Sequence, residues 1–68
     1  MKIRVKISRI KDEKEIQLEK GSTVMDLLNN LKFKPDNVVV MSGNTPIPID
    51  DKLKDKQEIT IIQVFSGG

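Results

Sequence analysis

The chain has 68 residues, a formal net charge of +2, and neither cysteine nor histidine. Its length allows one domain with a modest core, and the missing residue types exclude disulfides, zinc sites built from Cys or His, and imidazole acid–base catalysis. An autonomous enzyme is therefore not expected, and the absence of a membrane-span-length apolar run or a signal peptide predicts a cytoplasmic protein.

The first third of the chain predicts an antiparallel hairpin. Its first strand has an apolar residue at every second position, the period of a half-buried strand: Met1, Ile3, Val5 and Ile7. Residues 11–14 form a polar break. A second strand is expected over residues 15–19, where Ile16 and Leu18 alternate with polar residues.

A short helix follows Gly21-Ser22. Thr23 is a suitable N-cap, and Asp26 stands at the capping-box position three residues later. The next apolar residues fall at helical spacing and predict one core-facing stripe: Val24, Leu27, Leu28 and Leu31. Pro35 prevents any longer helix.

The last part of the chain predicts three more extended segments. Residues 38–41 are β-branched and apolar, residues 45–49 contain two prolines and suit a short edge strand, and residues 58–64 form the last strand. Leu53 is expected to enter the core from a polar loop. One group of apolar residues is expected either on an ordinary half-covered face or on a docking surface: Val38, Val40, Met41 and Ile47.

The expected element order predicts an α+β fold. One helix with one apolar stripe needs one sheet to cover it, so we expect a mixed sheet of about four to five strands with the helix across one face. Residues 1–64 would form this domain, and residues 65–68 a flexible Gly-Gly tail.

This order resembles the ubiquitin-like β-grasp fold, and more narrowly the ThiS/MoaD family of sulfur carriers. The similar segments are Gly21–Leu28, Leu53–Asp55 leading into Glu58–Ile61, and Ser66-Gly67-Gly68. Lys56-Gln57 stands where the family usually has Gly-Asp. The resemblance implies that the first and last strands lie parallel at the sheet centre.

The resemblance also implies a chemistry for the tail. A separate ubiquitin-activating-type enzyme would use ATP and Mg²⁺ to adenylate the Gly68 carboxylate, and a persulfide donor protein would then replace AMP with sulfur. The resulting thiocarboxylate would serve a sulfur-accepting synthase. Thiamin thiazole, molybdopterin and thiolated tRNA bases all remain open as products, and this chain itself would bind no cofactor or metal.

Each tail residue has an expected role. Gly68 carries the reacting carboxyl, and Gly67, without a Cβ, passes through a narrow channel to the nucleotide. Ser66 extends the slim tail, and Phe65 and Val64 are expected to anchor the partner. Phe65 could equally cap the edge of the core, and two terminal glycines occur by chance in about one chain in 200.

Two other functions stay open. The adenylated Gly68 could be passed to a lysine of another protein, which would make the chain a protein modifier. Alternatively, the cations Lys2, Arg4, Lys6 and Arg9 could bind nucleic acid or an acidic partner. We interpret those cations as the polar face of a strand, because no exposed aromatics are interleaved for base stacking. A monomer that docks transiently is expected.

Overall fold

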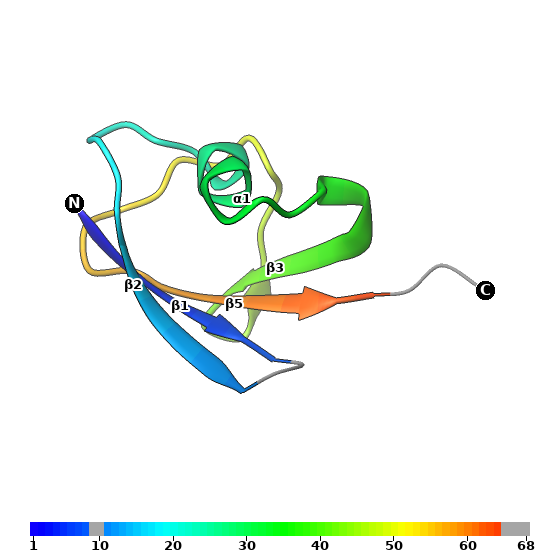
Figure 1. Ribbon diagram of the computed structural model, residues 1–68. Coiled ribbons are helices and arrows are strands. Elements are labelled where there is room, and N and C mark those ends of the chain that lie inside the picture. The colour runs from blue at the N-terminus through cyan, green and yellow to red at the C-terminus, as the bar shows by residue number, and fades with distance from the viewer. Residues whose placement is uncertain (9–10, 65–68) are drawn as a thin grey trace.

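A five-stranded mixed sheet with one α-helix across it forms the part of the protein that the computed structural model describes, residues 1–8 and 11–64 (Figure 1). In chain order the elements are β1 (Lys2–Ile7), β2 (Asp12–Gln17), α1 (Val24–Leu31), the 3₁₀ helix η1 (Pro35–Asn37), β3 (Val38–Ser42), β4 (Thr45–Pro46) and β5 (Glu58–Gln63). The predicted fold class is confirmed.

The strands lie in the order β2-β1-β5-β3-β4, and β1 and β5 run parallel at the centre. This confirms the topology that the family resemblance implies. Figure 1 shows α1 crossing one face of the sheet, so this helix-facing side holds the core. The residues buried there are all aliphatic: Ile3, Val5, Ile7, Val24, Leu27, Leu28, Val38, Val40, Leu53, Ile59 and Ile61.

The β1–β2 hairpin begins its second strand earlier than the sequence predicts. β2 starts at Asp12, which pairs with Ile7, and not at Glu15. The polar break predicted over residues 11–14 is therefore wrong beyond Lys11, because the backbone groups of β1 need a partner along its full length. The charged side chains tolerate this position because β2 is an edge strand, where charges also discourage pairing with another chain.

The helix is capped at both ends by local interactions. The Thr23 hydroxyl accepts from the Asp26 amide at 3.4 Å, and the Asp26 carboxylate accepts from the Thr23 amide at 2.8 Å, so the predicted capping box is confirmed. The helix ends at Leu31, earlier than Pro35 alone would require. Lys32 adopts the left-handed conformation with φ 62°, and the Phe33 amide donates to Leu28 O at 2.9 Å.

The register of β3 corrects the predicted exposed apolar group. Val38 and Val40 lie opposite Gln63 and Ile61, on the helix side, and are buried. Ile47 is partly buried against the same core. Met41 is therefore the predicted residue that remains on the open face. The apolar run Val38–Met41 has no alternation, so hydrogen bonding to β5 decides which side each residue faces.

The chain from Thr45 to the last strand is mostly a loop that hydrogen bonds and a buried leucine hold in place. β4 has two residues and lies at the sheet edge, as the two prolines of the predicted segment 45–49 indicate. Leu53 is 5% exposed, which confirms its predicted place in the core. Its amide donates to Ser22 O at 2.9 Å, which ties the loop to the start of α1.

The turn before β5 keeps a glycine-type backbone without glycine. Lys56 has φ 62°, and its amide donates to Lys2 O at 2.7 Å. The Gln57 side chain accepts from the Lys54 amide and donates to the Ser42 hydroxyl, both at 2.8 Å. The turn that joins the loop to the central strand is therefore held by the Gln57 amide group at the position where the family carries Gly-Asp.

Replacing Lys56 with glycine is expected to stabilise the protein. A left-handed residue with a Cβ costs about 1–2 kcal/mol, while glycine adds about 0.5–1 kcal/mol of unfolded-state entropy, so Lys56→Gly should gain about 0.5–1 kcal/mol. Lys20→Gly is the matched control, because Lys20 has no positive φ and should lose stability. Urea unfolding of both variants measures the difference, and a loss at Lys56 equal to that at Lys20 would contradict the turn geometry.

Asp55 gives the stability of this turn a pH dependence. Its carboxylate accepts from the Lys2 amide at 2.8 Å, and this hydrogen bond lowers its pKa below 3.8, with the amino terminus and Lys56 adding to the shift. The pKa of Asp55 in the folded state is thus below its value in the unfolded state. The ionised carboxylate therefore stabilises the fold at pH values above 3.8, and this stabilisation is lost as the pH falls through the folded-state pKa.

Asp55→Asn should therefore be less stable than the parent chain at neutral pH, because the neutral amide makes only a weaker hydrogen bond, and nearly equal to it in acid, once the pH has fallen below the folded-state pKa of Asp55. Urea midpoints at both pH values provide the measurement. Asp50→Asn, which removes an exposed carboxylate earlier in the same loop, is the matched control. A gap for Asp55→Asn that persists in acid would show that the charge is not responsible.

Candidate functional site

The candidate site is the carboxyl-terminal end of the central strand β5. After Gln63 the chain is fixed once more, because the Val64 amide donates to Asn37 O at 2.8 Å. In Figure 1 this end of β5 emerges beyond α1, on the side of the molecule where η1 lies. Val64, the last described residue before the predicted tail, is therefore held beside η1 at the end of the central strand.

Of the predicted site residues, Val64 is within the described structure. It is 41% exposed, which suits the anchor role predicted for it but does not establish that role. Phe65, Ser66, Gly67 and Gly68 lie outside the described residues. Their predicted roles in anchoring, channel passage and adenylation stay predictions.

Beside Val64, the open face of the sheet carries an apolar strip that runs across three strands. Val39 pairs with Ile62, and Met41 pairs with Pro46, so these side chains share the face that α1 does not cover. Val39 is 40% exposed. The strip consists of Val39, Met41, Pro46, Ile62 and Val64, and it shares only Met41 with the group predicted from the sequence.

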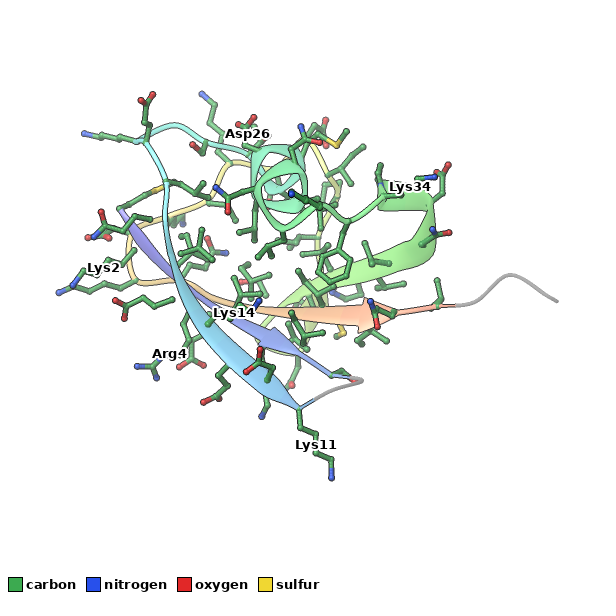
Figure 2. The ribbon with its side chains drawn as sticks, viewed as in Figure 1. Lys2, Arg4, Lys11, Lys14, Asp26 and Lys34 are labelled. Atoms are coloured by element: carbon green, nitrogen blue, oxygen red, sulfur yellow. The ribbon has the colours of Figure 1, made fainter. Side chains whose placement is uncertain are left out.

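The other half of the open face, over β1 and β2, is charged but balanced. The Lys2 Nζ atom lies 3.8 Å from Glu15 Oε1, and Arg4 Nη1 lies 3.7 Å from Glu58 Oε1. Lys6 pairs in register with Glu13. Figure 2 shows Lys2 and Arg4 extending from this side of the molecule. Acidic residues on both neighbouring strands thus accompany the β1 cations, which supports the polar-face interpretation over nucleic-acid binding.

A groove that the sequence did not predict lies on the helix side of the same strand end. It has a volume of about 350 Å³ and is lined by residues from the segment after α1, from η1, from the start of β3 and from the end of β5: Lys32, Phe33, Lys34, Asn37, Val38, Gln63 and Val64. A signal for it is present in the sequence, since Lys32-Phe33-Lys34 places an aromatic residue between two cations immediately before Pro35. Strand pairing then brings this tripeptide beside Gln63.

Within residues 1–8 and 11–64, acidic side chains form no group of three or more that could hold a metal ion. The helix found in this part of the chain is too short to cross a membrane. The described residues offer two surfaces around the strand that leads to the tail, the apolar strip and the groove.

Comparison with known proteins agrees with this architecture. An uncharacterized protein of Archaeoglobus fulgidus is 35% identical over 69 residues and spans the full length of both chains. The sulfur carrier protein TtuB of Thermus thermophilus is 21% identical, over 91% of this chain and 95% of its own.

A solved structure described as a molybdopterin converting factor subunit 1 of Pyrococcus furiosus has a TM-score of 0.78 and 24% identity, and it covers 94% of this chain and 98% of that one. This likeness shows that the two chains share the ubiquitin-like β-grasp fold. A profile of the family described as small archaeal modifier protein 2 matches residues 1–65. The chain therefore belongs to the small archaeal modifier protein 2 family.

Proposed function

We propose that this protein is a sulfur carrier whose Gly68 carboxylate is adenylated by a separate ubiquitin-activating-type enzyme and converted to a thiocarboxylate. The observation that carries the proposal is the similarity to the sulfur carrier protein TtuB, which extends over 91% of this chain and 95% of that protein. The chain is thus a substrate carried between partners and not itself a catalyst.

The chemistry of the tail follows from leaving groups. Hydroxide leaves poorly from a carboxylate, so sulfur cannot replace it directly. Attack of the Gly68 carboxylate on the α-phosphate of ATP forms an acyl-adenylate and releases pyrophosphate. The sulfur of a persulfide then bonds to the carbonyl carbon, AMP leaves with the bonding electron pair, and reductive cleavage of the sulfur–sulfur bond by a thiol frees the thiocarboxylate.

The described residues support this role by fixing the strand that leads to the tail. β5 lies between β1 and β3, and the Val64 amide donates to Asn37 O, so Val64, at the base of the proposed tail, is held in place. The apolar strip of Val39, Met41, Pro46, Ile62 and Val64 adjoins that base. We assign it as the face that the activating enzyme covers, because apolar surface beside a reacting terminus stabilises a partner when it is buried.

A protein modifier is the second candidate, and the name of the family favours it. The same adenylate would then be transferred to a lysine amine of a target protein, with formation of an isopeptide bond. Both roles need activation at Gly68 and differ only in the group that attacks the activated carbonyl. A nucleic-acid-binding module is disfavoured by the ion pairs along β1.

Activation is tested by ATP–pyrophosphate exchange with the ubiquitin-activating-type enzyme of the source organism. Exchange that depends on this chain is expected, because forming the acyl-adenylate is reversible and releases pyrophosphate. Adding a persulfide donor should convert the chain to its thiocarboxylate, whereas transfer to lysines would favour the modifier role. No exchange above the enzyme-only control at any concentration of the chain would contradict both roles.

A further inference from the structure

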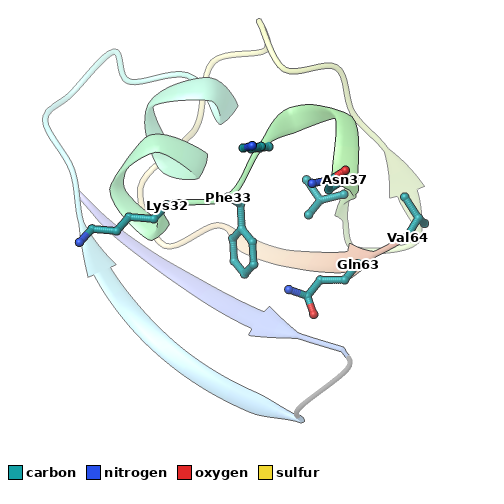
Figure 3. Close-up of a pocket in the computed structure, with 7 residues that line it drawn as sticks. Lys32, Phe33, Asn37, Gln63 and Val64 are labelled. Atoms are coloured by element: carbon teal, nitrogen blue, oxygen red, sulfur yellow. The ribbon is translucent and has the colours of Figure 1, made fainter. Parts of the chain in front are cut away.

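One rim of the groove beside the end of β5 is the segment of residues 32–34, which follows α1. The left-handed Lys32 and the hydrogen bond from the Phe33 amide to Leu28 O set the direction of this segment. The base of the groove includes Val38, which is 9% exposed. Figure 3 shows the Phe33 ring and the Gln63 side chain extending into the same region over β5.

The groove carries positive charge that other side chains do not balance. Lys32 and Lys34 are exposed, and within residues 1–8 and 11–64 neither forms an ion pair, unlike Lys2 and Arg4. Asp36 is the nearest carboxylate in the sequence, but it does not line the groove. Two cations and one adjacent acid leave this corner of the molecule attractive to acidic groups.

The remaining lining groups suit a peptide. Phe33 is half-buried against the core and leaves part of its ring toward the groove, where an apolar side chain could pack. The side-chain amides of Asn37 and Gln63 can each donate and accept hydrogen bonds, as a peptide backbone requires. Cations, an aromatic surface and amides together match an acidic segment that contains an apolar residue.

The groove also reaches the last described residues before the tail. Gln63 and Val64 line it, and in the sequence only residues 65–68 follow Val64 up to the proposed reacting carboxyl. An extended chain of that length spans at most about 14 Å, so an enzyme that holds the Gly68 carboxylate at its nucleotide must come within about that distance of Val64. Val64 also belongs to the apolar strip, so the groove and the strip meet at the base of the tail.

We propose that an acidic segment of the adenylating enzyme binds in this groove, with its carboxylates at Lys32 and Lys34 and an apolar side chain against Phe33. The enzyme would thus hold β5 from both sides, by the apolar strip on the open face and by the groove on the helix face. This inference rests on the proposed function, since it names a second contact with the same partner.

The test measures ATP–pyrophosphate exchange by the ubiquitin-activating-type enzyme of the source organism as a function of carrier concentration. Lys32→Glu/Lys34→Glu reverses the groove charge, and Lys32→Gln/Lys34→Gln removes it. Lys20→Glu/Lys52→Glu is the control, because it changes the net charge by the same amount as Lys32→Glu/Lys34→Glu. Its two positions lie near the opposite end of α1, where the backbone of Lys52 forms an isolated β-bridge with the N-cap Thr23. Thermal unfolding establishes that each variant is folded.

Lys32→Glu/Lys34→Glu should raise the KM for the carrier about tenfold, and Lys32→Gln/Lys34→Gln should have a KM between that value and the parent value. The kcat of both variants should stay within about twofold of the parent kcat. Added salt should raise the parent KM and have less effect on the neutral pair. Equal KM values for the groove and control variants would overturn the proposal while leaving the proposed function standing. Concentration-dependent self-association that Lys32→Glu/Lys34→Glu abolishes would assign the groove to a second copy and overturn it too. Absence of exchange with the parent chain would remove the proposed function and this inference together.

Discussion

Deleting Gly67 and Gly68 is expected to abolish adenylation of the chain without changing its stability. The buried core and the hydrogen bonds described above lie within residues 1–64, so the deletion removes none of them. It does remove the proposed reacting carboxyl, and the new terminus ends two residues short of the nucleotide. ATP–pyrophosphate exchange and urea unfolding, measured on the same preparation, separate the two effects.

A single substitution tests whether the tail passes through a narrow channel of the activating enzyme. Gly67→Val keeps the terminal carboxyl but adds a branched side chain where we expect a narrow passage. Its kcat/KM should fall about 100-fold, since displacing a reacting group by about 1 Å has a cost of that order. Ser66→Ala keeps the tail slim and should stay within about twofold. Unchanged activity of Gly67→Val would show that the tail does not thread a narrow channel.

Leu27→Ala is expected to bring the protein close to unfolding at room temperature. Leu27 is 0% exposed and lies in the apolar stripe that joins α1 to the sheet. Its truncation should cost about 2–5 kcal/mol, while a chain of this size has roughly 3–10 kcal/mol in total. A decrease in melting temperature of roughly 10–30 °C is expected, measured by circular dichroism.

Asn30→Ala, on the exposed side of the same helix, is the matched control and should change stability by no more than about 0.5 kcal/mol. The comparison matters for function because α1 covers the strands that hold β5 in place. A cost below about 1 kcal/mol for Leu27→Ala would contradict the packing of α1 on the sheet.

The parts of the fold that were predictable from the sequence are those that local interactions decide. The capping box of Thr23 and Asp26 and the helical stripe of leucines depend on spacing within about two turns, so both were confirmed. The alternation of Ile3, Val5 and Ile7 likewise fixed which side of β1 is buried. The sequence also predicted Leu53 in the core, because it is the one apolar residue in a polar loop.

The parts that the sequence predicted wrongly depend on partners far away in the chain. Val38 and Val40 were expected in an exposed group, but the register with β5 turns them inward and leaves Val39 outside. β2 begins at Asp12 because β1 supplies hydrogen-bond partners to residues of low strand propensity. The groove escaped prediction for the same reason, since Phe33 and Gln63 meet only after β5 has paired with β3.

The central claim, that Gly68 carries sulfur, is tested most directly by intact-protein mass spectrometry of untagged chain purified from its native cells. Part of the population should have the mass gained when one sulfur replaces one oxygen, and fragmentation should place that change on Gly68. A terminus that is always a plain carboxylate, even after incubation with ATP, a persulfide donor and cell extract, would contradict the sulfur-carrier function.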